Sequence, residues 1–559
     1  MQSRAALLAL LGLLGCPRRR APRPVPPAAF TLTVVATNDL HGRLGMLPWL
    51  GGHLANLRAS RSSVLLVDAG DLFQGTLESN QDEGATVVRA YNHLGYDAVA
   101  VGNHEYDFGP EGPAVFARGP GEDPQGALQA RAREARFSFL SANVVRAGTS
   151  QRPPWARVTA SVVVARGVPV GLVGVSTEDT LTTTLAMNVR GLAVLPLAET
   201  VTSEARALRA SGARVVVVLA HAGGRCRRFT DPEDLSSCDG AQEVFALARA
   251  LPAGLVDVIA AGHTHQGIAH RVNGVAVLES FSQGRAFGRV DLTVDPSRGV
   301  TGARVFPPRD LCAERGGDEP DPERCHPEPY EGRPVLRDEA LQALVAPSLE
   351  RARGARDRPL GVTVEAPVVT RYNQESALTN LVATMTLRAS PGADVGVMNA
   401  GGVRVDLPAG ALTYGRLYAT LPFENRLVTV RMRGRALRAA LEENARSDAG
   451  VLGVAGVRVT VRCDGGVLAQ VTRDDGRAVT DDEVLTVATN DFLATGALRR
   501  HLEAPLDEAQ ALDAPVLRDA VGEALAREAP VLRGGDPRWY DPARPRWALP
   551  SARPVRCGR

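Results

Sequence analysis

Five short apolar runs in the first half of the chain each end in polar residues, and this repeated pattern limits the possible folds more than any other feature. The runs are rich in Val, Leu and Ala, and their lengths are typical of buried β-strands. The polar residues follow the runs and do not precede them. The pairs are 31–36 with Asn38, Asp39 and His41, 63–67 with Asp68 and Asp71, 96–101 with Asn103 and His104, 214–219 with His221, and 256–261 with His263 and His265.

The order of these segments predicts a layered α/β domain. Stretches that are compatible with helices separate the apolar runs. In open α/β sheets, ligand-binding side chains gather in the crevice at the carboxyl ends of the strands. We therefore expect the polar residues of the five runs to meet at one edge of the fold.

The residue types in this set favour metal binding. Two carboxylates, one amide and four imidazoles suit Zn²⁺, Mn²⁺, Fe²⁺ or Co²⁺ better than Ca²⁺. Any one of these histidines alone is more simply explained as a structural imidazole, but the whole set at successive strand ends is not. The candidate ligands are Asp39, His41, Asp71, Asn103, His221, His263 and His265. His104 is free to act on a substrate, and Asp107 is placed to hold its imidazole in orientation.

These motifs resemble those of the calcineurin-like metallophosphoesterases and, more narrowly, of the secreted 5′-nucleotidase family. They are Asn38-Asp39-x-His41-Gly42, Gly70-Asp71, Gly102-Asn103-His104-Glu105, Ala220-His221 and Gly262-His263-Thr264-His265, and the resemblance covers roughly residues 30–500. It implies two divalent metal ions: one bound by Asp39, His41 and His265, the other by Asn103, His221 and His263, with Asp71 between them. His104 and Asp107 match the catalytic pair of the family. Some members have Gln at the position of His265.

The resemblance also implies an α/β architecture in two parts: a layered β-sandwich flanked by helices, and a smaller C-terminal domain that binds the substrate. The residues of this sequence that match the family's substrate motifs are Arg371, Asn399, Gly401, Gly402, Arg404, Phe423 and Phe492. The two phenylalanines correspond to rings that sandwich a nucleotide base, and each stacked base gains about 1–3 kcal/mol.

Two positions depart from the family pattern in the C-terminal domain. Arg371 lies one residue further upstream than the family's phosphate-side arginine, and Tyr372 takes the usual position. Leu498 stands where the family has an aspartate that binds ribose hydroxyls. The resemblance is therefore complete for the residues that carry out hydrolysis and incomplete for those that bind the sugar.

Residues 1–16 are typical of an export signal, because Arg4 precedes a short apolar run. The segment ends in Leu13-Leu14-Gly15-Cys16, which resembles the bacterial lipobox and implies lipidation of Cys16. An ordinary secretory signal with an incidental cysteine is the alternative. We expect a Pro-rich tether over 17–29, a metallophosphoesterase domain over 30–295, a linker with a helix over 296–360, the substrate domain over 361–540 and a tail over 541–559.

The six other cysteines suit an oxidising compartment. Nearness in the sequence suggests the pairs Cys226–Cys238 and Cys312–Cys325, which leaves Cys463 with Cys557, although other connectivities are possible.

The sequence thus predicts an exported phosphohydrolase, anchored to the membrane through Cys16, that removes phosphate from nucleoside 5′-monophosphates. UDP-sugars, 2′,3′-cyclic nucleotides or aryl phosphodiesters are alternative substrates for the same fold. A catalytically silent surface binding protein is the alternative from another class. The net charge of +2 gives no reason to expect a nucleic acid polymer as a partner.

Overall fold

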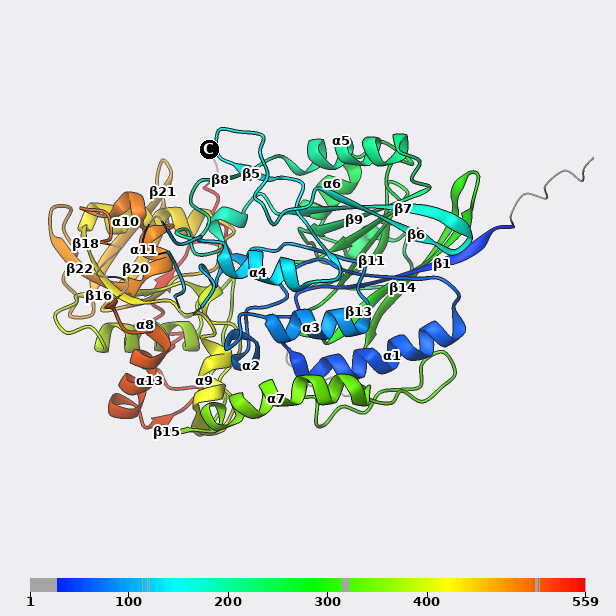
Figure 1. Ribbon diagram of the computed structural model, residues 1–559. Helices are drawn as coiled ribbons and strands as arrows, with labels where there is room; N and C mark the ends of the chain where they lie inside the picture. The colour runs from blue at the N-terminus through cyan, green and yellow to red at the C-terminus, as the bar shows by residue number, and fades with distance from the viewer. Residues whose placement is uncertain are drawn as a thin grey trace, which may run out of the picture.

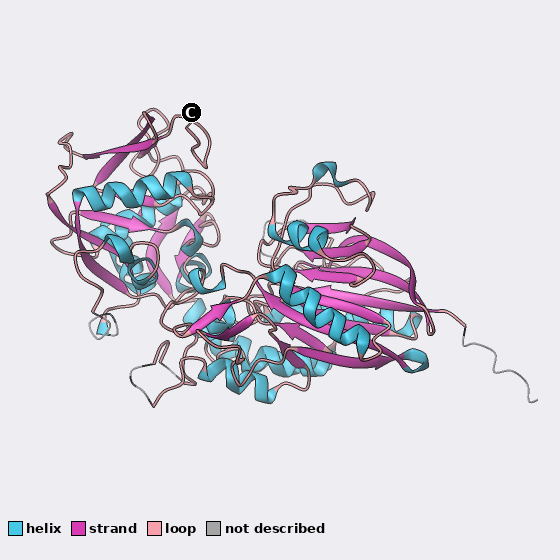
Figure 2. Cartoon of the chain, turned by 90° about the horizontal axis from the view of Figure 1, so that it is seen from above, coloured by secondary structure: helices cyan, strands magenta, loops and turns pink. Residues whose placement is uncertain are grey.

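The computed structural model describes residues 28–557 apart from 113, 118, 120, 314–320, 508–510 and 512. The expected signal peptide, Cys16 and nearly all of the tether lie outside these residues. Two α/β units lie next to each other (Figures 1 and 2), and helix α7 (Glu339–Arg356) runs below the N-terminal unit in Figure 1 and contacts α9 (Tyr414–Thr420) of the C-terminal unit. Within the described residues, every helix falls short of the length and apolar character that a membrane crossing requires.

The N-terminal unit is a sandwich of two six-stranded sheets. The first sheet has the order β14 (Gly299–Asp310), β13 (Ala286–Asp295), β1 (Phe30–Thr37), β2 (Val64–Asp68), β3 (Ala98–Ala100) and β4 (Ser138–Leu140). The second has the order β11 (Gly267–Val272), β12 (Val275–Ser280), β10 (Val258–Ala261), β9 (Val215–His221), β7 (Val168–Ser176) and β6 (Thr159–Val164). A small ladder joins β5 (Val144–Arg146) to β8 (Leu192–Val194).

The central strands of both sheets are parallel. Antiparallel strands close both edges of the second sheet and the β13–β14 edge of the first, whose other edge strand, β4, runs parallel to β3. Fully buried apolar side chains such as Val34, Leu65, Val217 and Val258 fill the space between the sheets. Helices cover both outer faces, as their shared apolar clusters show. They are α1 (Leu47–Ser60), α3 (Ala85–Leu94), α4 (Gly126–Glu134) and α7 on the first sheet, and α5 (Leu197–Ala210) and α6 (Glu243–Ala250) on the second. The expected layered sandwich is confirmed.

The C-terminal unit contains three smaller sheets and several helices. The sheets have the orders β17 (Gly410–Thr413), β15 (Pro359–Val364), β23 (Val531–Leu532); β18 (Leu427–Arg433), β22 (Val484–Asn490), β16 (Val395–Met398), β19 (Gly453–Ala455); and β21 (Val467–Arg473), β20 (Val457–Cys463), β24 (Trp547–Ala548). The helices include α8 (Ala377–Arg388), α9 (Tyr414–Thr420), α10 (Gly434–Arg446), α11 (Asp491–Thr495) and α13 (Leu517–Glu528).

Two segments lie elsewhere than the expected domain limits suggest. Strand β14 continues the first sheet to Asp310, because a turn at 295–299 returns the chain antiparallel to β13. The expected tail is packed into the C-terminal unit through β24, where Trp547 is buried. The disulfide Cys463–Cys557 fastens the end of this segment, and the pairs Cys226–Cys238 and Cys312–Cys325 are present as well. The suggested cysteine pairing is confirmed.

Candidate metal centre and substrate site

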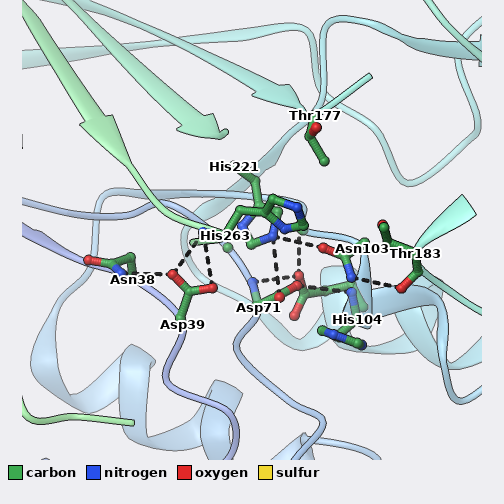
Figure 3. Close-up of polar contacts among 12 residues, drawn as sticks. Asn38, Asp39, Asp71, Asn103, His104, Thr177, Thr183, His221 and His263 are labelled. Atoms are coloured by element: carbon green, nitrogen blue, oxygen red, sulfur yellow. Dashed lines mark hydrogen bonds and ion pairs between the residues drawn. The ribbon is translucent and has the colours of Figure 1, made fainter. Parts of the chain in front are cut away.

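The carboxyl ends of the central strands meet at the face of the sandwich that looks toward the C-terminal unit. In the first sheet, Thr37 pairs with Asp68 and Asp68 with Val99, so β1, β2 and β3 end side by side. In the second sheet, Ala261 pairs with Ala220. The loops that follow these strands bring the predicted polar residues together (Figure 3).

The first cluster consists of Asp39, His41 and His265, whose ligand atoms lie within 4.8 Å of one another. His265 Nε2 is 3.5 Å from Asp39 Oδ1 and 3.0 Å from His41 Nε2. Asp39 and His41 are buried, and the His265 side chain is 25% exposed. An oxygen and two imidazole nitrogens at this spacing fit a divalent transition metal or zinc.

The second cluster consists of Asp71, His221 and His263, again with ligand atoms within 4.8 Å. His221 Nε2 lies 3.2 Å from Asp71 Oδ2 and 3.0 Å from Asn103 Oδ1. Asp71 Oδ2 also lies 3.8 Å from His41 Nε2 in the first cluster. Asp71 is therefore placed between the two clusters, as a bridging ligand requires.

Main-chain carbonyls orient two of the imidazoles. His41 Nδ1 is 2.8 Å from the carbonyl of Gln74, and His221 Nδ1 is 2.9 Å from that of Ala69. Because Nδ1–H donates to the carbonyl in each case, Nε2 faces the cluster. This outer contact is the usual way in which proteins fix a metal-binding histidine.

Several residues in this region have the left-handed backbone conformation, which residues other than glycine rarely adopt. Asp39, His41, Asp71, His263 and His265 have φ between +50° and +81°. Non-glycine residues in the left-handed region cost roughly 1–3 kcal/mol each and cluster at functional sites. Gly102 is needed beside them, because a Cβ there would lie 2.1 Å from Asp71 Oδ1.

The electrostatics of the clusters suit cations. Burial alone raises the pKa of Asp71, but His221, His104 and His41 outweigh burial and bring the pKa well below its usual value. Burial also raises the pKa of Asp39, but His265 and His221 lower it to about 2. Burial lowers the pKa of His263 to about 3. Anionic carboxylates and a neutral imidazole are the forms that bind metal.

Two buried carboxylates hold the loops that carry the clusters. Glu105 accepts N–H bonds from Gly102, Asp71 and Leu72 at 2.6–2.9 Å. Glu279, on β12, accepts from Thr264 Oγ1 at 2.6 Å and from the N–H of Gly224 at 3.0 Å. The sequence prediction did not include Glu279, although its place at the end of the apolar run 275–278 is a sixth instance of the same pattern.

His104 and Asp107 form the expected pair beside the clusters. His104 Nδ1 lies 2.6 Å from Asp107 Oδ2, and the His104 ring centroid is 5.5 Å from that of His41. Burial lowers the pKa of His104, but Asp71 and Asp107 outweigh it and raise the pKa above its usual value. The ring is thus held by one nitrogen, with the other available to a substrate.

The C-terminal unit contributes directly to this site. Arg404 Nη2 lies 3.3 Å from His265 Nε2 and 3.5 Å from His41 Nε2. The Phe423 ring centroid lies 5.3 Å from that of His104. Next to this ring, the carbonyl of Pro422 accepts a 3.0 Å bond from Gln74 Nε2, so the two units are joined at the site itself.

Three of the other predicted substrate residues lie in the loop that leads to Arg404, and Phe492 follows a residue that binds this loop. Asn399 Oδ1 accepts a 2.9 Å bond from Asn490, the N-cap of the short helix that carries Phe492, and Gly401 and Gly402 follow Asn399 in the same loop. Arg371 is exposed and donates to the carbonyl of neighbouring Thr370.

Tyr372 and Leu498 occupy the two positions that depart from the family pattern. The Tyr372 ring lies against the Asn399–Arg404 loop, since a Cβ on Gly401 would lie 3.7 Å from it. Leu498 is 2% exposed and packs in the core of the C-terminal unit, so it does not form an open wall next to a sugar.

The remaining histidines have other surroundings. His53 is buried against the rings of Phe287 and Tyr330. His93 contacts Asp338, and His501 contacts Glu443. His270 lies near Cys226 and Cys238, but the disulfide between these cysteines leaves no thiolate for a metal. The main chain of His326 accepts a bond from Ala313.

Comparisons with known proteins agree with this geometry. A family model described as calcineurin-like phosphoesterase matches residues 32–267, and one described as 5′-nucleotidase, C-terminal domain, matches residues 359–500. UshA of Yersinia enterocolitica is 25% identical over 517 residues, which are 84% of this chain and 86% of UshA. Endonuclease YhcR of Bacillus subtilis is also 25% identical, over 92% of this chain, but the chain spans only 42% of that protein.

A solved structure extends the likeness to the fold of the whole chain. The 5′-nucleotidase precursor from Thermus thermophilus superposes with a TM-score of 0.69 at 24% identity, and the match covers 91% of this chain and 100% of that one.

Proposed function

Because the chain belongs to the 5′-nucleotidase family of calcineurin-like phosphoesterases, we propose that it removes phosphate from nucleoside 5′-monophosphates with two divalent metal ions. The observation that carries the proposal is the pair of buried Asp/His clusters around Asp71, with Arg404 of the second unit reaching the same point. This arrangement combines residues for hydrolysis with residues for holding a charged substrate.

In this proposal, Asp39, His41 and His265 hold one metal, Asn103, His221 and His263 hold the other, and Asp71 bridges them. Bound metals of this kind polarise a phosphoryl oxygen and activate water. His104 stabilises the negative charge that develops on the phosphoryl group or the leaving oxygen, and Asp107 keeps its ring in place. Arg404 neutralises part of the substrate's charge through charge-assisted hydrogen bonds.

The second unit supplies the contacts that favour a nucleotide. Phe423 and Phe492 would stack on the base, and Asn399, Gly401 and Gly402 line the loop that leads to Arg404. A stacked base is recognised with little sequence preference, because every base has a π-face. We propose that Arg371 contributes less to substrate binding than Arg404, because its side chain is exposed.

A substrate panel tests the proposal. Full-length protein loaded with Mn²⁺ or Zn²⁺ should release inorganic phosphate from all common nucleoside 5′-monophosphates, and EDTA should abolish the release. Hydrolysis of UDP-sugars, 2′,3′-cyclic nucleotides or bis(4-nitrophenyl) phosphate, with nucleoside monophosphates left intact, would favour the alternative specificities. Metal binding without hydrolysis of any phosphoester would favour a binding protein.

We expect the protein to discriminate poorly between ribose and 2′-deoxyribose. Leu498 stands where the family has an aspartate, but it is buried in the core of the C-terminal unit, so this position offers no acceptor to a ribose hydroxyl. A site without such an acceptor rejects the deoxy compound poorly. We expect kcat/KM for AMP and dAMP to agree within about tenfold. Steady-state phosphate release on both substrates is the measurement, and a strong preference for AMP would show that another residue binds the ribose hydroxyls.

We also propose that the protein is exported and anchored through Cys16. Replacing Cys16 with Ser should move the protein from the detergent-soluble membrane fraction to soluble or uncleaved material, because the acylated thiol is lost. Fractionation followed by immunoblotting measures the change. Identical fractionation of the variant and the wild type would leave only an ordinary secretory signal.

A further inference from the structure

A partly buried segment between β7 and β8 lies against the loop that carries Asn103, His104 and Asp107. The Nδ2 of Asn103 donates to the carbonyl of Thr183 at 3.0 Å (Figure 3). One residue later, Thr184 Oγ1 donates to Asp107 Oδ1 at 2.7 Å. Asn188 Nδ2 then donates to the carbonyl of Tyr106 at 2.8 Å. The segment Thr183–Asn188 therefore contacts this loop at three residues, Asn103, Tyr106 and Asp107.

The contact from Thr184 completes the hydrogen bonding of Asp107. One carboxylate oxygen of Asp107 binds His104 Nδ1 and the other accepts from Thr184. A carboxylate that is held at one oxygen only can turn about its terminal bond, which has a broad torsional preference. Thr184 is 2% exposed, and the side chain of Asp107 is 9% exposed, so little water is present to replace the hydroxyl.

We propose that Thr184 is a positioning residue for phosphoester hydrolysis: it fixes the Asp107 carboxylate and, through it, the ring of His104. The inference rests on the proposed role of His104. Outer contacts of this kind typically change activity by about 10–100-fold when they are removed. Because Thr184 reaches neither the clusters nor the Arg404 loop in the described contacts, its removal should leave metal content and KM unchanged.

A nearby threonine outside this segment provides a matched control. Thr182 is exposed, and its hydroxyl donates to the carbonyl of Asp179 at 2.8 Å. Thr184→Val should lower kcat about tenfold, with two metals per chain and an unaltered KM. Thr184→Ser should restore most of the loss, because serine keeps the donor, and Thr182→Val should have wild-type kcat. An equal loss in Thr182→Val, or a loss of metal in Thr184→Val, would overturn the inference.

A double-mutant cycle separates positioning from general packing. In an Asp107→Ala background, Thr184→Val should lower kcat no further, because the group that it orients is gone. A further tenfold loss in that background would show that Thr184 acts by packing and would overturn the proposal. Phosphate release from whichever phosphoester the wild type hydrolyses best serves as the assay.

A spectroscopic measurement keeps this inference distinct from the proposed function. The Nδ1–H proton of His104 should give a downfield NMR signal that is absent in His104→Ala. Thr184→Val should shift or broaden this signal, Thr184→Ser should restore it, and Thr182→Val should leave it in place. If the wild type hydrolysed no phosphoester, the proposed function would fail and this signal alone would decide the inference. An unchanged signal in Thr184→Val would refute it.

Discussion

Replacing Asp71 with Asn should lower both the metal content and the activity of the protein. Asp71 Oδ2 lies 3.2 Å from His221 Nε2 and 3.8 Å from His41 Nε2, so one carboxylate serves both clusters. A neutral amide cannot hold two cations as a carboxylate does. We expect fewer than two metals per chain by inductively coupled plasma mass spectrometry, and a fall in kcat/KM of at least about 10²-fold.

Asp97→Asn is a suitable control for this change. Asp97 is a partly buried carboxylate that accepts the N–H of Leu66 at 2.9 Å, at the end of β3 that lies away from the clusters. The control variant should keep two metals and normal turnover. If Asp71→Asn itself kept two metals and near-normal turnover, Asp71 would not be the bridging ligand.

Replacing His104 with Ala should separate catalysis from metal binding. The ring lies beside the clusters and is held by Asp107, but it belongs to neither group of ligand atoms. Loss of a side chain that serves only the transition state should lower kcat by about 10²-fold or more, while KM and metal content change little. Kinetics and metal analysis on the same preparation check this result.

His93→Ala provides the matched control for His104. His93 is exposed on α3 and contacts Asp338, away from the site, so its removal should not affect kcat. If His104→Ala lost a metal ion, His104 would be a ligand rather than a group that acts on the substrate.

The sequence was sufficient to predict the sandwich and to bring most of the site together. Asp39, Asp71 and His221 follow apolar strands, and parallel strands place their carboxyl ends at one edge, so the pattern carries three-dimensional information. The disulfides followed from nearness in the chain and an even count. The two short disulfides follow from a local feature, whereas Cys463–Cys557, 94 residues apart, was assigned as the remaining pair.

The rest depends on contacts that no local pattern encodes. Thr184 lies 77 positions from Asp107 in a segment without a regular apolar period, and only tertiary packing brings them together. Arg404 reaches His265 across the boundary between two units, which its own motif does not reveal. The packing of Trp547 into the C-terminal unit was missed because its strand, β24, has only two residues.

Gln74 links a candidate metal ligand to the other half of the protein. Its carbonyl binds His41, and its side chain binds the carbonyl of Pro422 beside Phe423. A change in the second half that moves the Pro422 carbonyl would therefore disturb the residue that orients His41 in the first. A hybrid that joined the first half of this protein to the second half of a relative such as UshA would have to reproduce the Gln74–Pro422 bond to keep His41 in place. Exchange of the two domains as a pair would leave both bonds of Gln74 intact.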